Sequence, residues 1–178
     1  MSLLLACPAP VWYPLDRCNM DLRGNASEVI EAMAKNEEAV GRLYQAYADK
    51  FPAQKAFWSG LAADETTHAG WIRGLQAKMR EGSLAVNRDR FKIQPVRGFS
   101  AYLERELTTA REPGMSPINA LSVALYIEES IIDQRYFEVF AADAPELKRV
   151  LAELAVATKS HLEKVREEWG KQRPSTSR

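Results

Sequence analysis

Three glutamates and two histidines are the residues of this 178-residue chain whose types and spacing best suit chemistry. Glu65 and His68 stand three apart in the segment ADETTHAGW, which on a helix leaves ~60° of rotation and ~4.5 Å of rise between them. The only other histidine, His161, follows Thr158 at the same spacing. Carboxylate and imidazole groups that point to one place can bind iron, manganese or zinc. The two segments can act together only if the fold brings them to the same level.

Apolar residues repeated three and four apart predict four long helices. Their expected ranges are 26–50, 53–80, 117–141 and 145–169. Pro52, Pro117 and Pro145 suit the first turns of helices, where the missing N–H has no helical partner to lose. A shorter amphipathic helix is expected at 99–112. Short turns join the first helix to the second and the third to the fourth, so each pair should be antiparallel neighbours.

The segment between the two pairs, 81–115, is long enough to run the length of a helix bundle. The sequence therefore predicts an all-α fold over residues 26–170. The expected architecture is a four-helix bundle of two antiparallel pairs, with a long crossover that contains the short helix. Residues 1–25, with three prolines, are expected to be an irregular lead-in, and 171–178 a disordered polar tail.

Each long helix interrupts its apolar seam near the middle with polar residues of types that bind metals. Those positions are Glu37, Glu65 with His68, Glu129, and Thr158 with His161. Burying unpaired carboxylates is costly, and no Lys or Arg occupies the central seams. One or two metal ions would supply the missing positive charge. The two halves also share a spacing, because a tyrosine follows the glutamate by seven residues in each, at Tyr44 and Tyr136.

This pattern resembles the ferritin-like di-metal carboxylate proteins, in which two helices give a Glu and two give Glu-x-x-His. It is most similar to the rubrerythrin group, over about residues 26–170. Carried over by position, the metal ligands are Glu37, Glu65, His68, Glu129 and His161. The family glutamate is replaced by Thr158, so Asp133 or Glu128 is a possible substitute ligand. The resemblance implies a ferritin-like bundle that binds one or two iron ions, with manganese or zinc as alternatives.

The resemblance also implies an activity, the reduction of hydrogen peroxide or oxygen at a di-iron centre. The chain lacks the four-cysteine rubredoxin domain of rubrerythrins, so an external donor would supply the electrons. A homodimer is expected from the family. Two alternatives stay open: a module that binds, stores or senses iron or manganese without turnover, and a structural bundle without metal. The missing glutamate at Thr158 favours the first of these.

Several of these residues also have simpler interpretations. A single glutamate on a helical seam usually reaches water at the edge of the core. Tyr44 and Tyr136 either fill the core or hold a ligand carboxylate on a neighbouring helix, as Thr158 could. Asp64 is expected to be solvated or to pair between helices. The tryptophans at 58, 71 and 169 are expected to pack in the core or to form a dimer face.

Composition excludes several classes of function. Lys+Arg and Asp+Glu both number 24, so the basic excess that nucleic-acid binding needs is missing. No apolar run approaches ~20 residues, which argues against a membrane-spanning helix. Cys7 and Cys18 are too few for a four-thiolate metal site and are interpreted as incidental. The start, MSLLLAC, has too short an apolar run for a signal and is interpreted as an irregular leader or a misplaced start, so a cytoplasmic protein is expected.

Overall fold

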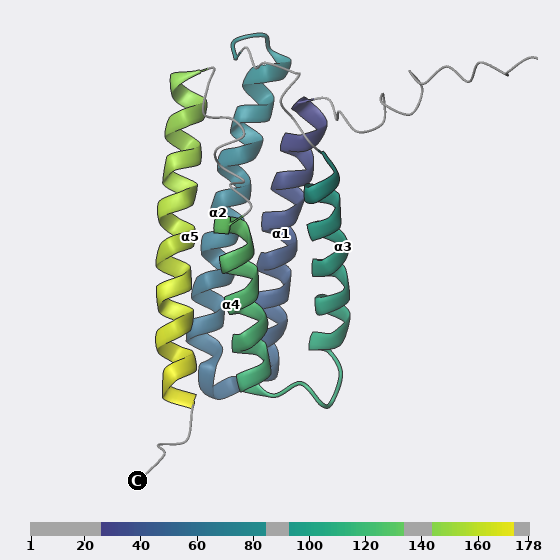
Figure 1. Ribbon diagram of the computed structural model, residues 1–178, viewed down its shortest axis with the longest axis vertical. Helices are drawn as coiled ribbons and strands as arrows, with labels where there is room; N and C mark the ends of the chain where they lie inside the picture. The colour runs from purple at the N-terminus through teal and green to yellow at the C-terminus, as the bar shows by residue number, and fades with distance from the viewer. Residues whose placement is uncertain (1–25, 85–92, 134–143, 173–178) are drawn as a thin grey trace, which may run out of the picture.

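A computed structural model describes residues 26–84, 93–133 and 144–172, and throughout these ranges the ordered elements are helices. The elements are α1 (Ala26–Lys50), the single 3₁₀ turn η1 (Pro52–Gln54), α2 (Lys55–Arg80), α3 (Ile93–Ala110), α4 (Pro117–Asp133) and α5 (Pro145–Gln172). The prediction of an all-α protein is confirmed. Figure 1 shows the long helices side by side along one axis.

The predicted helix boundaries agree with most of these elements. The first helix has the expected bounds, and the second begins only after the short turn that follows Pro52. The last helix continues to Gln172, so the tail begins later than expected. Several predictions fall outside the described residues: the lead-in at 1–25 with both cysteines, the continuation of the third long helix beyond 133, and the final residues from 173.

Helix α3 is longer at its start than the sequence predicted. It begins at Ile93 rather than at residue 99, although Pro95 and Gly98 lie within it. Proline is tolerated in a first turn because its missing N–H would have no partner there. The apolar face of α3 packs on α1, and the Asn36 side chain of α1 donates to the Val96 carbonyl at 3.2 Å. This packing explains why weak helix formers adopt helical structure here.

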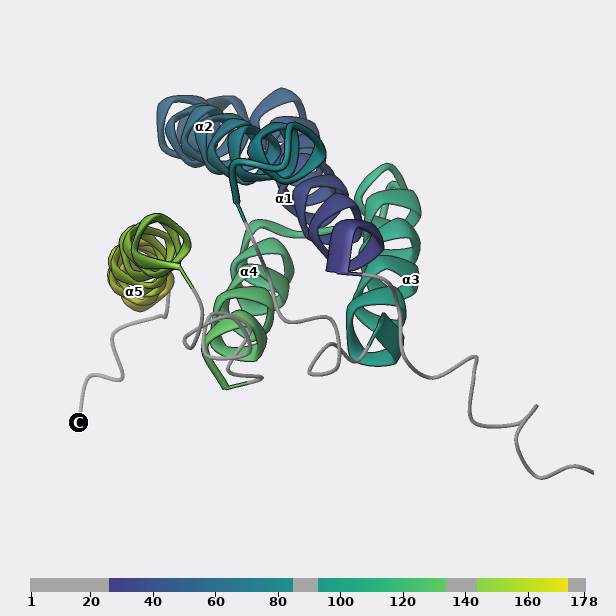
Figure 2. The same cartoon turned by 90° about the horizontal axis from the view of Figure 1, so that it is seen from above.

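The helices α1, α2, α4 and α5 surround a common interior, and α3 lies outside against α1 (Figure 2). Following the chain in Figure 1, α1 and α5 run downward while α2 and α4 run upward. Neighbouring members of the four are therefore antiparallel. Between α2 and α4 in the chain, helix α3 runs downward beside α1 (Figure 1). The described part of α4 lies beside the lower half of the other three helices, so its later turns reach the level of the middle of α1, α2 and α5 (Figure 1).

A polar layer divides the buried interior into two apolar clusters. The first cluster includes Val40, Tyr44, Trp58, Leu61, Leu103, Leu121, Ile127 and Val165. The second includes Ile30, Met33, Ile72, Leu75, Ile93, Leu147, Leu151 and Leu154. Along α1, α2 and α5 the chain passes from one cluster to the other, and the buried charged residues lie between them. The layer is therefore closed above and below by apolar side chains.

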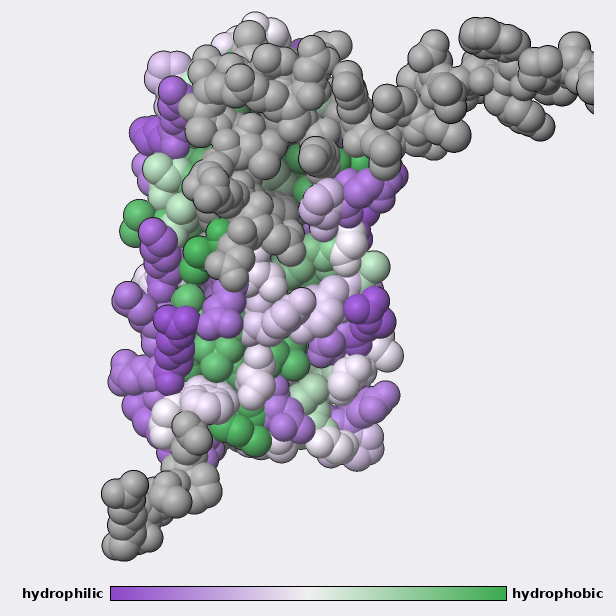
Figure 3. All heavy atoms as spheres, viewed as in Figure 1, coloured by the Kyte–Doolittle hydropathy of each residue, from purple (hydrophilic) through white to green (hydrophobic). Residues whose placement is uncertain are grey.

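The surface of the molecule carries both hydrophilic and hydrophobic side chains (Figure 3). On the face seen in Figure 3, hydrophilic side chains line the outer edge of α5, while hydrophobic atoms show through in the lower half around α4. Helix α4 is apolar on several sides, and its Tyr126 is 57% exposed. Among the described residues no helix is both long and apolar enough to cross a membrane.

Replacing Trp58 with alanine should lower the free energy of unfolding by about 3–5 kcal/mol. The Trp58 side chain is fully buried and lies 4.9 Å, between ring centroids, from both Tyr47 and Phe57. Urea denaturation measures the loss. Trp71→Ala is the control, since Trp71 is 37% exposed and should cost much less. Equal losses in the two variants would contradict the packing described above.

Candidate metal centre

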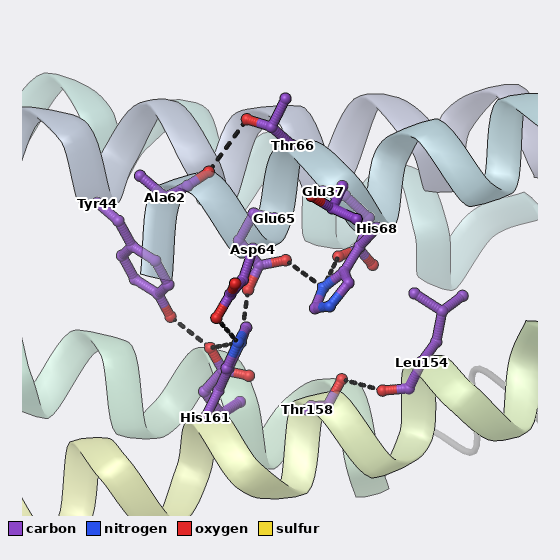
Figure 4. Close-up of polar contacts among 12 residues, drawn as sticks. Glu37, Tyr44, Ala62, Asp64, Glu65, Thr66, His68, Leu154, Thr158 and His161 are labelled. Atoms are coloured by element: carbon purple, nitrogen blue, oxygen red, sulfur yellow. Dashed lines mark hydrogen bonds and ion pairs between the residues drawn. The ribbon is translucent and has the colours of Figure 1, made fainter. Parts of the chain in front are cut away.

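The buried polar layer gathers side chains from all four central helices. Its members are Glu37 of α1, Glu65 and His68 of α2, Glu128 of α4, and Thr158 and His161 of α5. Each is at most 5% exposed. The α2 and α5 residues share a helix face because three residues are close to one turn. Figure 4 shows Glu65, His68 and His161 pointing toward one another across the gap between α2 and α5.

The Glu65 carboxylate is the centre of this layer. Its Oε2 lies 3.1 Å from Nδ1 of His68, and its Oε1 lies 2.9 Å from Nδ1 of His161. An ionised carboxylate can only accept hydrogen bonds, so both Nδ1 atoms donate in the absence of metal. The two imidazole rings lie 5.3 Å apart, between centroids, and are stacked. One carboxylate thus joins a histidine on its own helix to a histidine on α5.

Two further glutamates flank this centre in equivalent positions. A Glu37 oxygen lies 3.8 Å from Nδ1 of His68, and a Glu128 oxygen lies 3.7 Å from Nδ1 of His161. Each half of the chain therefore contributes one Glu–His pair, and Glu65 lies between the two pairs. Among the described residues, Oε2 of Glu128 has no hydrogen-bond partner although it is buried. An unpaired buried carboxylate oxygen is costly unless a cation or a donor reaches it.

The prediction of which α4 residues face the interior is wrong by one position. Glu129, predicted to face the interior, lies on the outer side of the helix, 47% exposed, where its carboxylate binds Arg166 at 2.8 Å. Glu128, considered from the sequence only as a substitute, occupies the interior with Ala124 and Ile131 on the same face. The error arose because α4 is apolar on several sides, which leaves its register ambiguous when only the apolar residues are counted.

The residues expected to support the ligands lie in different surroundings. The Tyr44 hydroxyl donates to Glu128 on the neighbouring helix at 2.6 Å. The Thr158 hydroxyl is buried in the layer but donates back to the Leu154 carbonyl of its own helix at 3.0 Å. Tyr136 and the side chain of Asp133 lie outside the described part of the chain. Thr158 therefore brings no carboxylate to the position that mirrors Glu65.

The contact of Asp64 with His161 was not predicted from the sequence. Asp64 was expected to be solvated or to pair between helices, and its carboxylate does pair with Lys164 of α5 at 3.4 Å. The same carboxylate oxygen also lies 3.2 Å from Nε2 of His161. A carboxylate on one ring nitrogen fixes the orientation of an imidazole whose other nitrogen faces a metal. The sequence carried one signal, an acidic residue next to the Glu-x-x-His segment.

In the absence of metal, the buried glutamates of the layer have pKa values far from those of free glutamate. Burial raises the pKa of Glu37 to about 8, and burial together with the nearby Glu65 charge raises the pKa of Glu128 to about 8. Burial also opposes ionisation of Glu65, but hydrogen bonds from His161 and His68 outweigh it and lower its pKa to about 2. Glu65 is thus the carboxylate that stays ionised at neutral pH.

Both histidine pKa values are raised. Burial favours the neutral imidazoles, but hydrogen bonds and the charges of the surrounding glutamates raise the pKa of His68 to about 10. For His161, contact with Glu65 likewise overcomes the effect of burial and raises the pKa. Without metal, protons on His68, Glu37 and Glu128 therefore leave Glu65 as the ionised carboxylate of the layer.

A carboxylate oxygen of Glu65 and one ring nitrogen each of His68 and His161 lie within 4.8 Å of one another, so these three residues could hold a metal ion. No protein-family model, curated protein or solved structure matches the chain. The geometry of the layer is therefore the observation that bears on function. Oxygen and imidazole donors without thiolate suit iron, manganese or zinc.

The metal-free protein should be most stable near about pH 5 and lose stability toward pH 8. Above pH 4.5 an unfolded glutamate releases its proton, whereas folded Glu37 and Glu128 keep theirs to about 8. The folded state then binds more protons, so rising pH favours unfolding. His68 acts in the same direction between 6.5 and about 10. Glu65 acts oppositely, and its contribution is lost as pH falls from 4.5 toward about 2.

Thermal unfolding in chelator at several pH values between 5 and 8 measures this dependence. Glu37→Gln should flatten the decline, because the amide resembles the protonated carboxyl and cannot ionise. A stability that rises from pH 5 to pH 8 in chelator would contradict the assignment of protons to the glutamates.

Proposed function

We propose that this protein is a ferritin-like, rubrerythrin-type carboxylate protein that binds two metal ions in the buried layer, with iron as the first candidate. The observation that carries the proposal is the arrangement of two Glu–His pairs around Glu65. Glu37 with His68 would hold one ion, and Glu128 with His161 the other. The two oxygens of Glu65 already face opposite histidines and would bridge the ions.

The buried charges support occupation by cations. Three carboxylates lie in the layer, and the described lysines and arginines near it lie at the surface instead. A metal ion can replace the protons that otherwise neutralise the glutamates and imidazoles. Binding should therefore release protons, and the apparent affinity should rise from acidic to mildly alkaline pH. The unpartnered oxygen of Glu128 would gain a partner in the same step.

Bound iron would supply one-electron chemistry toward hydrogen peroxide or oxygen. The chain's own residues would bind and orient the ions. Tyr44 fixes Glu128 by its short hydrogen bond, and Asp64 holds the outer nitrogen of His161. The apolar clusters on either side keep bulk water from the layer. Electrons for repeated turnover would come from an external donor.

A second function, metal binding or storage without turnover, is favoured by Thr158. Its hydroxyl is engaged with the Leu154 carbonyl, so the layer has one bridging carboxylate where a second would complete the symmetry. Three glutamates and two histidines shared by two ions leave each ion with three protein groups. Such open coordination suits either reaction with a small molecule or weak, exchangeable binding of the second ion.

Glu128→Gln should lower the affinity for one of the two ions by roughly a hundredfold or more, since loss of even an outer-shell partner costs 10–100-fold. The matched control is Glu129→Gln, which removes the same charge from the adjacent residue on the exposed side and should leave both ions bound. Calorimetric titration with Fe(II) under anaerobic conditions, checked by elemental analysis, counts the ions. Equal affinities in the two variants, or no binding by the native chain, would exclude the proposed site.

Hydrogen peroxide distinguishes the two functions. In the enzymatic case, two bound ferrous ions would each supply one electron to one hydrogen peroxide molecule. The peroxide would also take up two protons, so that two ferric ions and two water molecules would form. A stopped-flow spectrum of the ferrous protein should show oxidation much faster than free Fe(II) under the same conditions. Oxidation no faster than that of free Fe(II), with the metal still bound, would leave binding or storage as the function.

A further inference from the structure

A surface pocket of about 270 Å³ reaches the buried layer between α2 and α5. Both histidines, His68 and His161, contribute to its lining. Asp64 and Lys164 stand at one side of it, and Trp71, whose ring centroid lies 5.2 Å from that of His68, stands at another. Close backbone contacts between α2 and α5 are sparse compared with those between α1 and α2. Figure 4 shows the two histidines facing this gap with Asp64 beside them.

We propose that this pocket is the entrance through which a divalent metal ion, and then a small uncharged oxidant of the peroxide class, reach the layer. The proposal rests on the proposed function, because it needs a metal to be bound. Other described pockets lie along α1, against α2 or α3, and none of them is lined by a member of the buried layer. The α2–α5 pocket, in contrast, is lined by both histidines.

The residues of the pocket suit passage rather than tight binding. Ala157 and Ser160 are small and leave the α5 side open, while Trp71 gives an apolar wall. The carboxylate of Asp64 touches both Lys164 at the surface and Nε2 of His161 inside. A cation that displaces the Lys164 ammonium from Asp64 would stand next to His161. The charge of the Asp64–Lys164 pair at the pocket opening should therefore affect the rate at which cations enter, but not the rate for a neutral oxidant.

Blocking the pocket tests the route. Ala157→Trp should slow loading of Co(II), a spectroscopic probe, by roughly tenfold or more, because packed side chains leave few voids larger than a water molecule. The final stoichiometry should not change, since no proposed ligand is altered. Val156→Trp is the matched control, because Val156 is the adjacent residue of α5 and is 68% exposed, outside the pocket. The same comparison applies to oxidation of the ferrous protein by hydrogen peroxide.

A second variant keeps the test valid if Ala157→Trp does not fold. Ser160→Cys places a thiol in the pocket, and a bulky maleimide closes it in protein that is already folded. The labelled Val156→Cys protein is the control, which also accounts for reaction at Cys7 and Cys18. Slower loading after labelling at 160, but not at 156, supports the entrance.

The charge at the mouth gives an independent measurement. Lys164→Glu should speed Co(II) loading several-fold at low salt, and the difference should vanish at high salt. Lys159→Glu makes the same change on an exposed part of α5 outside the pocket and should have little effect. Peroxide oxidation of the loaded protein should be equal in both variants.

Two failures are distinguishable. If the native chain binds neither Co(II) nor Fe(II), the proposed function is wrong, and the proposed entrance fails with it because there is no metal to admit. If the native chain binds metal but both blocked proteins load and oxidise at the native rate, the metal site stands and the entrance is elsewhere.

Discussion

The structure depends on one buried anion, the carboxylate of Glu65, which accepts a hydrogen bond from a histidine on each side. A carboxylate at this depth is tolerable only when its charge is balanced and both oxygens are occupied. His68 on the same helix and His161 on α5 meet both requirements. Because the partners come from two helices, this balance exists only when α2 and α5 are aligned at one level. The layer therefore fixes how the two halves of the chain meet.

The apolar interior is arranged around that requirement. Two clusters of buried side chains lie on opposite sides of the layer and supply most of the burial that holds the helices together. Polar groups between them gain little net stability and are costly when unmatched. An interior that accepts this cost at one level, with protons shared among glutamates and histidines, is well suited to exchange those protons for metal ions. The sparse packing of α2 against α5 beside the histidines gives such ions a way in.

The layer is symmetric in its outer parts and asymmetric in its centre. Glu37 with His68 and Glu128 with His161 have nearly equal separations, although the glutamate that repeats the Glu37–Tyr44 spacing is the exposed Glu129. At the centre, Glu65 has no carboxylate counterpart, because position 158 is a threonine, whose hydroxyl donates to its own helix backbone. Two ions in this layer would therefore share a single carboxylate, that of Glu65. The affinity for the second ion relative to the first is the property that would distinguish a catalytic site from a storage site.

The sequence by itself predicted the all-α class, most of the helix bounds among the described residues, the antiparallel pairing of α1 with α2 and most of the layer, because periodic apolar residues and short turns are local signals. It also placed Glu37, Glu65 and both histidines at one level, since these residues interrupt seams that are otherwise apolar. Only the tertiary structure decided between Glu128 and Glu129, because α4 is apolar on several sides and its register is set by the helices packed against it. The link from Asp64 to His161, and the pocket beside it, likewise depend on how closely α2 and α5 approach, which no local pattern specifies.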